Sequence, residues 1–501
     1  MFKVKKIDID AENELIAILN KKDAYKLSLY PNQRIKIFNS KNKQSVICVL
    51  EVLNGVKKRN FDLDKEEIGL YARAFEKLNI KKGSRIQIIP AEKPESLEYV
   101  KEKIKGKRLN LNQFNEIVLD IVENRYSQIE TTFFVIACTI NSLNDTETIA
   151  LTKAMTNVGQ CLNFKKNEND IIIDKHCIGG LPGNRTSMIV VPIIAAAGLK
   201  IPKSSSRAIT SPAGTADTME VLTNVEVPIN KMYNEVQEIN GCLVWGGSLN
   251  LSPADDLIIK VEHPLEIDSE GQMIASILSK KKSVGSTHVL IDIPVGPTAK
   301  IKNINHANKL KKRFEKIAKA IDLKVKIIIT DGNEPIGDGI GPKYEALDVL
   351  KVLKNEEGAS IQLRRKGLYL AGLMLEMAKV CKKGEGYARA RGILDSGIAF
   401  EKFDEILNYQ GKNTNIPVAK YSYKVQSITK GKVYGIDNMK IAKIAFILGA
   451  PEDKTAGLIL HKKLSSIVDS NDVLFEIFTN SKLKLKYAQV YLENNIIYSV
   501  K

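Results

Sequence analysis

One stretch of this sequence constrains the fold more than any other. An apolar run at residues 188–199 is framed by two loops rich in glycine and hydroxyl side chains, at residues 174–187 and 204–217, and a strand-like run at residues 171–173 precedes them. Strand, loop and apolar helix in this order are typical of an α/β sheet, whose ligands bind beyond the carboxyl ends of the strands. Glycine lets backbone N–H groups approach an anion, and a helix N-terminus adds a positive dipole end. Both loops together therefore predict a phosphate site.

Charged and hydroxyl side chains in the two loops supply the remaining anion-binding groups. Lys175, expected to follow directly on the strand, and Arg207 would bring full positive charge. Asp174 either binds ligand or caps the loop, and both alternatives stay open. Asn184 and Gly198 are the predicted N-cap and C-cap of the apolar helix. Neutral donors are expected from Ser205, Ser206, Thr210, Ser211 and Thr215.

The overall charge is the one feature that suggests a nucleic-acid-binding protein. The chain has 501 residues and a formal charge of +17, from 75 basic and 58 acidic side chains. The lysines are spread along the chain rather than gathered into one arm, which favours a solvated surface that mildly steers anionic substrates. We therefore predict no nucleic-acid partner and keep that reading as the alternative from another class of function.

Cysteine and histidine usage predicts neither a disulfide framework nor a metal site. The six cysteines include no Cys-x-x-Cys pair, and the five histidines are not paired at metal-ligand spacing. Cys177 has no histidine placed to activate it as a nucleophile. The first eight residues lack the apolar segment of a signal peptide, and residues 188–199 are too short to span a bilayer. We predict a soluble, cytoplasmic protein without metal, cofactor or membrane partner.

Hydrophobic periodicity divides the chain into four parts. The fold class is predicted as α/β, with a mixed, mostly parallel sheet lobe facing a helical lobe. Residues 91–107 are expected to be a linker that is helical in part. The predicted parts are a β-rich N-terminal domain at 1–90, a helical lobe at 108–165 completed by about 256–285, an α/β phosphate-binding and catalytic domain at 166–420, and a C-terminal α/β domain at 421–501.

The loop motifs also carry a resemblance to a known family. Asp174-Lys-His-x-x-Gly-Gly180, followed by a serine, an arginine and Gly-Thr-x-Asp217, resembles the signature of the thymidine/pyrimidine-nucleoside phosphorylase family. The fuller wording of residues 179–186 and 206–217 is similar to its archaeal AMP phosphorylase branch. The likeness runs from about Leu109 to the C-terminus, and the segment 1–90 resembles the extra N-terminal domain of that branch.

This resemblance implies an activity and a set of site residues. The implied reaction is phosphorolysis of a nucleoside 5′-monophosphate, AMP and phosphate giving adenine and ribose 1,5-bisphosphate, with CMP and UMP as further substrates, in nucleotide salvage by a homodimer or larger homo-oligomer. Asp268 would protonate the departing base, and Lys280 would contact the base. Lys175, Gly179 and Ser205 would hold the attacking phosphate. The implied substrate-binding residues are Gly180, Ser206, Arg207, Ala208, Ile209, Thr210, Ser211, Thr215, Ser276 and Lys300.

Two other enzymes remain as alternatives. A thymidine or pyrimidine nucleoside phosphorylase would read the pyrimidine partly through an arginine upstream of Asp268, where this chain has Val-Glu-His at residues 261–263. An anthranilate-type phosphoribosyltransferase shares the lobed design but needs a metal–pyrophosphate site that the sequence does not show. Asp268 itself is also consistent with a helix N-terminal aspartate, and Lys281 and Lys282 are expected to be solvated.

Overall fold

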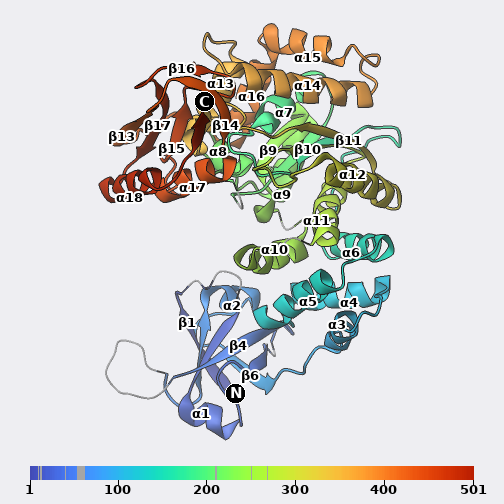
Figure 1. The fold of residues 1–501 in the computed structure, drawn as a ribbon. Helices are drawn as coiled ribbons and strands as arrows, with labels where there is room; N and C mark the ends of the chain where they lie inside the picture. The colour runs from blue at the N-terminus through green and yellow to red at the C-terminus, as the bar shows by residue number, and fades with distance from the viewer. Residues whose placement is uncertain are drawn as a thin grey trace. The chain divides into compact units, whose positions relative to one another are not determined.

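The computed structural model describes residues 1–9, 11, 14–39, 41–53, 63–208, 211–249, 251–267 and 269–501. Three predicted site residues, Ile209, Thr210 and Asp268, lie outside these ranges. Contacts within the chain divide it into two compact units, Met1–Val158 with Pro253–Ala275, and Gly159–Ser252 with Ser276–Lys501. Figure 1 shows the chain coloured from blue at the N-terminus to red at the C-terminus.

A barrel forms the first part of unit 1 (blue in Figure 1). In the described residues six strands close it in the order β1-β5-β2-β4-β3-β6, with β1 parallel to β5 and antiparallel to β6. Alternate side chains point inward because successive strand residues face opposite sides; Phe2 and Val4 of β1 are buried, and Lys3 between them is exposed. The elements are β1 (Phe2–Ile7), β2 (Ile16–Asn20), α1 (Lys21–Lys26), β3 (Arg34–Phe38), β4 (Ser45–Leu53), β5 (Glu67–Tyr71), α2 (Ala72–Lys77) and β6 (Arg85–Pro90).

A helical bundle forms the rest of unit 1. Capping boxes start three of its helices, at Asn110, Ser127 and Asn144. The expected linker at residues 91–107 contains α3, whose Val100 is buried in the bundle core, so this segment belongs to the bundle. The helices are α3 (Leu97–Ile104), α4 (Leu111–Val122), α5 (Gln128–Ile140), α6 (Asp145–Asn157) and α10 (Pro253–Leu265).

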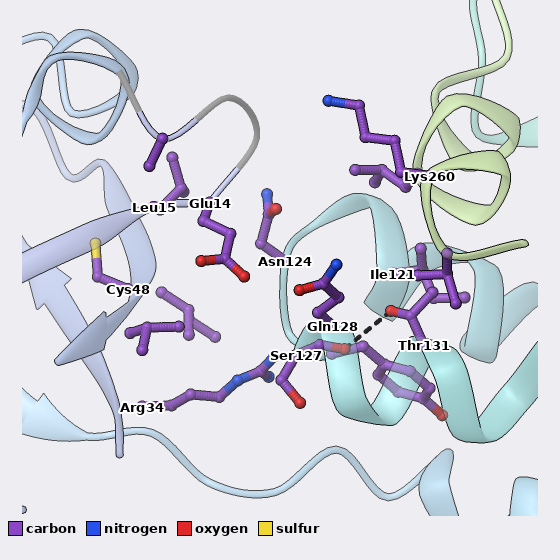
Figure 2. Close-up of a pocket in the computed structure, with 16 residues that line it drawn as sticks. Glu14, Leu15, Arg34, Cys48, Ile121, Asn124, Ser127, Gln128, Thr131 and Lys260 are labelled. Carbon is purple, nitrogen blue, oxygen red and sulfur yellow. Dashed lines mark hydrogen bonds between the residues drawn. The ribbon is translucent and has the colours of Figure 1, made fainter. Parts of the chain in front are cut away.

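Unit 1 also contains a pocket of about 280 Å³ (Figure 2). Glu14 and Arg34 line it on the barrel side, and Asn124 and Gln128 line it on the bundle side. Burial lowers the pKa of Arg34, while Glu130, 3.4 Å away, acts in the opposite direction. None of the predicted site residues within the described ranges lines this pocket.

A parallel sheet organises unit 2. Strands β11 (Lys324–Asp331), β10 (His288–Val295) and β7 (Ile173–Cys177) pair in parallel, as do β8 (Ile201–Ser205) and β9 (Gly241–Trp245). A parallel bridge between Ile172 and Lys200 links the two groups. Six successive residues of β10 are buried, as expected for a parallel strand covered on both faces.

Helices cover this sheet. The predicted apolar helix is α7 (Thr186–Ala196), which is buried from Thr186 to Ala195 and packs against α14 and α16. Both predicted caps were one residue off, because Arg185 is the N-cap residue and Ala197 the C-cap residue, followed by Gly198 with φ +83°. The other helices are α8 (Thr215–Met219), α9 (Ile229–Ile239), α11 (Glu270–Ser283), α12 (Ile304–Lys319), α13 (Pro342–Leu353), α14 (Ile361–Met377), α15 (Gly386–Asp395) and α16 (Ile398–Gln410).

The C-terminal part of unit 2 contains two further sheets, β12-β15-β17-β13 and β16-β14-β18. Their shared core includes Val433, Ile441, Leu458 and Phe475. No helix in the described part of the chain is long and apolar enough to cross a membrane. The elements are β12 (Gly339–Ile340), β13 (Tyr421–Gln426), β14 (Gly431–Ile436), α17 (Asn438–Leu448), β15 (Gly457–Leu460), β16 (Ile467–Val468), β17 (Val473–Thr479), α18 (Lys482–Glu493) and β18 (Tyr498–Val500).

A buried ion pair in the bundle gives a stability prediction. Lys103 Nζ lies 2.6 Å from Glu147 Oε1, and both side chains are at most 2% exposed. Replacing Lys103 with Met leaves Arg108 as the remaining ion-pair partner of the buried Glu147 carboxylate. We therefore expect the free energy of local unfolding of α3 and α6 to fall by about 3 kcal/mol. Hydrogen exchange of these helices measures it. The control Lys101→Met, which removes an exposed pair with Glu98, should cost less than about 1 kcal/mol; equal losses would contradict the prediction.

Candidate active site

Strand β7 carries two charged residues into the core. Asp174 and Lys175 pair in register with Val289 and Leu290 of β10, so they lie inside the strand. The prediction that Lys175 directly follows the strand was wrong: β7 begins two residues later than the apolar run and ends at Cys177. Asp174 is 0% exposed and Lys175 is 2% exposed. Charges this deeply buried need partners or a ligand.

The Lys175 ammonium is directed at the start of α7. Its Nζ donates to Thr186 Oγ1 at 2.6 Å and to Ser187 Oγ at 3.4 Å. Burial lowers its pKa, while the neighbouring Asp292 raises it. An ammonium, two hydroxyls and a helix N-terminus in one place favour an anion. Thr186 and Ser187 were not predicted, although their place after the glycine loop was the available signal.

Asp174 holds a second lysine in the same region. Its Oδ2 accepts a hydrogen bond from Lys281 Nζ of α11 at 2.6 Å, and its Oδ1 accepts from the Lys175 backbone N–H, also at 2.6 Å. Lys281 is 2% exposed, so the expectation that it is solvated was wrong. The carboxylate of Asp174 attracts it into the core and offsets part of the desolvation cost.

Lys203 of β8 is a third buried lysine, 6% exposed, which sequence reasoning missed. Its Nζ donates to Ser204 O, and burial, with Lys281 nearby, lowers its pKa to about 7. A signal was present, because Ile201, Lys203 and Ser205 share one face of the strand and Ile201 is a core residue.

Ser205 ends β8 with an unused polar group. Its Oγ is buried and has no hydrogen-bond partner among the residues that the structure describes. A buried hydroxyl left unbonded costs about 1–3 kcal/mol, so this atom is expected to meet a ligand or water. Lys175, Lys203, Lys281 and Ser205 all belong to unit 2. We call the three lysines with Asp174 the lysine cluster.

Two glycines shape the loops. Gly180 has φ +54°, a conformation that other residues rarely adopt. A Cβ on Gly214 would lie 2.3 Å from Ser206 O, which no side chain tolerates. Asp217 fixes the second loop, because its Oδ2 accepts the backbone N–H groups of Ala208 at 2.6 Å and Gly214 at 2.8 Å.

Arg207 is surrounded by carboxylates. Its guanidinium lies 3.2 Å from Asp217, 2.8 Å from Glu220 and 3.1 Å from Glu226. It also stacks over the Trp245 ring, 4.7 Å from the centroid. Hydrogen bonds, first to Glu220, raise its pKa above the usual value. Three carboxylates compensate its charge within the protein, which weakens the expectation that it serves a phosphate.

Other donors of the two loops are also engaged inside the protein. Arg185, 6% exposed, donates to Glu345, to Ala213 O at 2.5 Å and to Thr215 Oγ1 at 3.1 Å. Ser211 Oγ donates to Ala213 O at 2.8 Å. Ser206 is exposed.

Cys177 is held as a neutral thiol. Its Sγ donates to Asp292 Oδ2 at 3.5 Å and accepts from Asn184 Nδ2 at 3.1 Å. Lys366 Nζ lies 3.0 Å from the same Asp292 oxygen. Burial raises the pKa of Cys177 to about 12. A thiol with this pKa is a poor nucleophile at neutral pH.

The remaining predicted residues lie on α11 and after β10. Ser276 and Lys280 are half-buried on α11, and Lys280 is close enough to His176 to help lower its pKa, an effect due mainly to burial. Lys300 is exposed in the turn that follows β10. Within the described ranges no group of three or more His, Cys, Asp or Glu side chains could hold a metal ion.

Comparisons with known proteins agree with this architecture. Residues 169–400 match the model "Glycosyl transferase family, a/b domain", residues 97–159 match the helical bundle domain of that family, and residues 432–499 match "Pyrimidine nucleoside phosphorylase C-terminal domain". A protein of Legionella pneumophila (strain Paris) named "Putative thymidine phosphorylase" is 46% identical over 446 residues, 89% of this chain and 85% of that protein. One of the same name from Albidiferax ferrireducens is 42% identical over 494 residues, 97% and 92% of the two chains.

The chain belongs to the thymidine/pyrimidine-nucleoside phosphorylase family. Like the matched models, it is a mixed α/β protein with a helical-bundle domain and an α/β domain. The solved anthranilate phosphoribosyltransferase of Thermus thermophilus has a similar fold, with a TM-score of 0.51, 18% identity, and coverage of 62% of this chain and 98% of that one. The archaeal AMP phosphorylase branch stays a prediction.

For this member of the thymidine/pyrimidine-nucleoside phosphorylase family, the state of Cys177 is testable. Because burial raises the pKa of the Cys177 thiol to about 12, we expect iodoacetamide at pH 8 to alkylate Cys177 at least tenfold more slowly than the exposed Cys161. Peptide mapping after timed alkylation measures both rates in one sample. Faster labelling at Cys177 would show that its thiolate is stabilised and would reopen a nucleophilic role.

Proposed function

We propose that the protein cleaves the N-glycosidic bond of a pyrimidine nucleoside with inorganic phosphate, releasing the free base and a pentose 1-phosphate. The observation that carries this proposal is the lysine cluster: three lysines are buried around Asp174, which forms an ion pair with Lys281, beside a Ser205 hydroxyl that has no partner in the described part of the chain. A bound anion would stabilise positive charge buried in this way, and phosphate is the anion that this reaction consumes.

The residues suit positioning of the nucleophile. Lys175 with Thr186 and Ser187, at the start of α7, would bind phosphate oxygens, and the backbone of Gly179 and Gly180 would approach from the loop. Held there, the dianion would attack C1′ while the pentose develops positive charge. Catalysis then rests on orientation and on a preorganised electrostatic environment, as no side chain needs to form a covalent bond.

The names of the relatives and the ion pairs of the loop arginines both favour a pyrimidine nucleoside as the substrate. Relatives that align with 89% and 97% of the chain are named for thymidine, and the C-terminal match is named for pyrimidine nucleosides. A nucleoside 5′-monophosphate would need further anion-binding groups for its 5′-phosphate. Arg185 and Arg207, two charged residues of the loops, pair with carboxylates, so fewer groups remain for a second phosphate.

Phosphorolysis of a nucleoside 5′-monophosphate, AMP giving adenine and ribose 1,5-bisphosphate, is the second candidate. The observation that favours it is the exposed Ser206 hydroxyl at the start of the second loop, in the wording shared with the AMP phosphorylase branch. In this candidate Ser206 to Ser211 and Thr215 would hold the nucleotide. For either substrate, Ser276, Lys280 and Lys300 remain the proposed contacts to the nucleoside portion.

Release of base from thymidine, uridine, CMP, AMP and adenosine, with and without phosphate, tests the function. We expect phosphate-dependent release, at least tenfold more efficient with a pyrimidine nucleoside than with AMP. Lys175→Ala should raise the phosphate requirement by about 10- to 100-fold, the equivalent of about 1.5–3 kcal/mol for one charge-assisted contact. Lys166 is exposed, so Lys166→Ala is the matched control and should change neither base release nor the phosphate requirement. A preference for AMP over the pyrimidine nucleosides would select the second candidate, and release of base without phosphate would refute phosphorolysis.

Asp268 remains the proposed acid that protonates the departing base, from the family resemblance. Asp268→Asn removes a proton needed mainly in the transition state, so turnover should fall at least 100-fold while the dissociation constant of the nucleoside changes less than threefold. Single-turnover rates and equilibrium binding measure the two separately. Asp256→Asn is the comparison for loss of a carboxylate nearby in the chain, and wild-type turnover in Asp268→Asn would exclude the role.

A further inference from the structure

Two buried lysines, Lys203 and Lys281, lie near each other, and Asp174 is the one carboxylate bonded to either of them among the residues that the structure describes. An ammonium has three donors and no acceptor, so two ammonium groups cannot bond to each other and repel at close range. Burial without a counter-charge favours the neutral amine, so one of these two lysines is expected to give up its proton.

The surrounding groups decide which lysine is neutral. Lys281 has the carboxylate of Asp174 at 2.6 Å, which stabilises its charge. Lys203 donates to the Ser204 carbonyl oxygen, an uncharged partner. Its side chain is almost fully buried, with Lys175 as a further cation in its surroundings. Lys203 is the group that gives up its proton, and a pKa lowered to about 7 agrees with this.

We propose that Lys203 is a proton-coupled phosphate sensor, neutral while the anion site is empty and protonated when a dianion binds beside Ser205. The inference rests on the proposed phosphate site and adds to it a positioning residue and a proton that no sequence motif indicated. An anion in the lysine cluster would reverse the local electrostatic balance, so that the ammonium form of Lys203 becomes favoured. Binding would then take up one proton from solvent, which the lysine nitrogen retains.

The other titratable groups around Lys203 are accounted for on each element. On β7 they are Asp174, Lys175 and His176, on α11 Lys281, and on β9 Cys242. Burial keeps the pKa of His176 well below its usual value and that of Cys242 well above, so both are neutral near pH 7. On α9, which also packs against β8, burial raises the pKa of Glu235 to about 9, so this group is neutral near pH 7. Burial also lowers the pKa of Lys175, so Lys175 and His176 are the competing acceptors for the proton, and a variant must separate them from Lys203.

The coupling between proton binding and anion binding determines how anion affinity changes with pH. Below pH 7 Lys203 already carries its proton, so anion binding takes up little; above pH 7 the proton must come from solvent. Proton uptake on anion binding should therefore be small at pH 6 and should approach one proton per site at pH 8. Over the same range the pH dependence of the anion dissociation constant should steepen toward about a tenfold increase per pH unit.

Sulfate is the probe, because it is a dianion that does not itself titrate near neutral pH. Isothermal titration of the full chain with sulfate, in two buffers of different ionisation enthalpy, gives the number of protons taken up at pH 6 and pH 8. Lys203→Met keeps the length and removes the amine, and Lys282→Met, one residue beyond Lys281 on the same helix, is the matched control. Inorganic phosphate is titrated in parallel to establish binding of the natural anion.

The outcomes separate the inference from the proposed function. The sensor is supported if sulfate binding at pH 8 takes up a proton in the wild type and in Lys282→Met but not in Lys203→Met. Sulfate binding without uptake at pH 8 in the wild type overturns it and leaves the phosphate site standing, and this result needs no variant. Proton uptake that persists in Lys203→Met assigns the proton to Lys175 or His176 and also overturns the sensor. Binding of neither anion refutes the phosphate site and the sensor together.

Discussion

The ion pair between Asp174 and Lys281 is the interaction around which unit 2 is arranged. It joins the start of β7 to the last turn of α11, with both charged groups removed from solvent. Coulomb attraction in such a place is strong, but desolvation of both ions is comparably expensive. The pair therefore needs the further contacts around it, and these hold the end of α11 against β7.

Packing alone does not explain why further positively charged side chains are buried around that pair. Lys175 and Lys203 are also buried, and the only carboxylate bonded within the described cluster is already shared. A core selected for stability alone would replace such lysines with apolar residues of similar volume. Retaining them has a stability cost that a bound anion can offset, which is the expected signature of a binding site.

Basic residues divide here into two classes that sequence alone does not distinguish. Arg185 and Arg207 stand in donor-rich loops and look like anion ligands, but carboxylates of α8, α13 and the segment after α8 engage them. Lys203 and Lys281 stand outside the glycine motifs and look ordinary, but they are buried. The guanidinium fork suits multidentate pairing within the protein, whereas a lysine amine can lose its proton when buried.

Elements determined by local pattern were predictable from sequence. Strand β6 and helix α7 follow from alternation, apolar content and the flanking glycines, and the two loops that frame α7 follow from their glycine-rich composition. The lysine cluster was not predictable, because Lys281 meets Asp174 across 107 residues of chain and its burial depends on that encounter. The strand start at Ile173 was missed because charged residues at 174 and 175 look like a loop until a partner strand covers them. Asp268 lies outside the described residues, so its role still depends on resemblance.

The second loop also depends on a residue far along the chain. Arg207 faces Asp217, Glu220 and Glu226, an excess of carboxylates, and Lys454 supplies another cation, 2.7 Å from Glu220 and 3.8 Å from Asp217. Lys454 follows α17 in the sequence, so the counter-charge of this loop is complete only when the C-terminal part of the chain has folded against it. The C-terminal part therefore contributes to the electrostatic balance of a loop that carries the sequence motif.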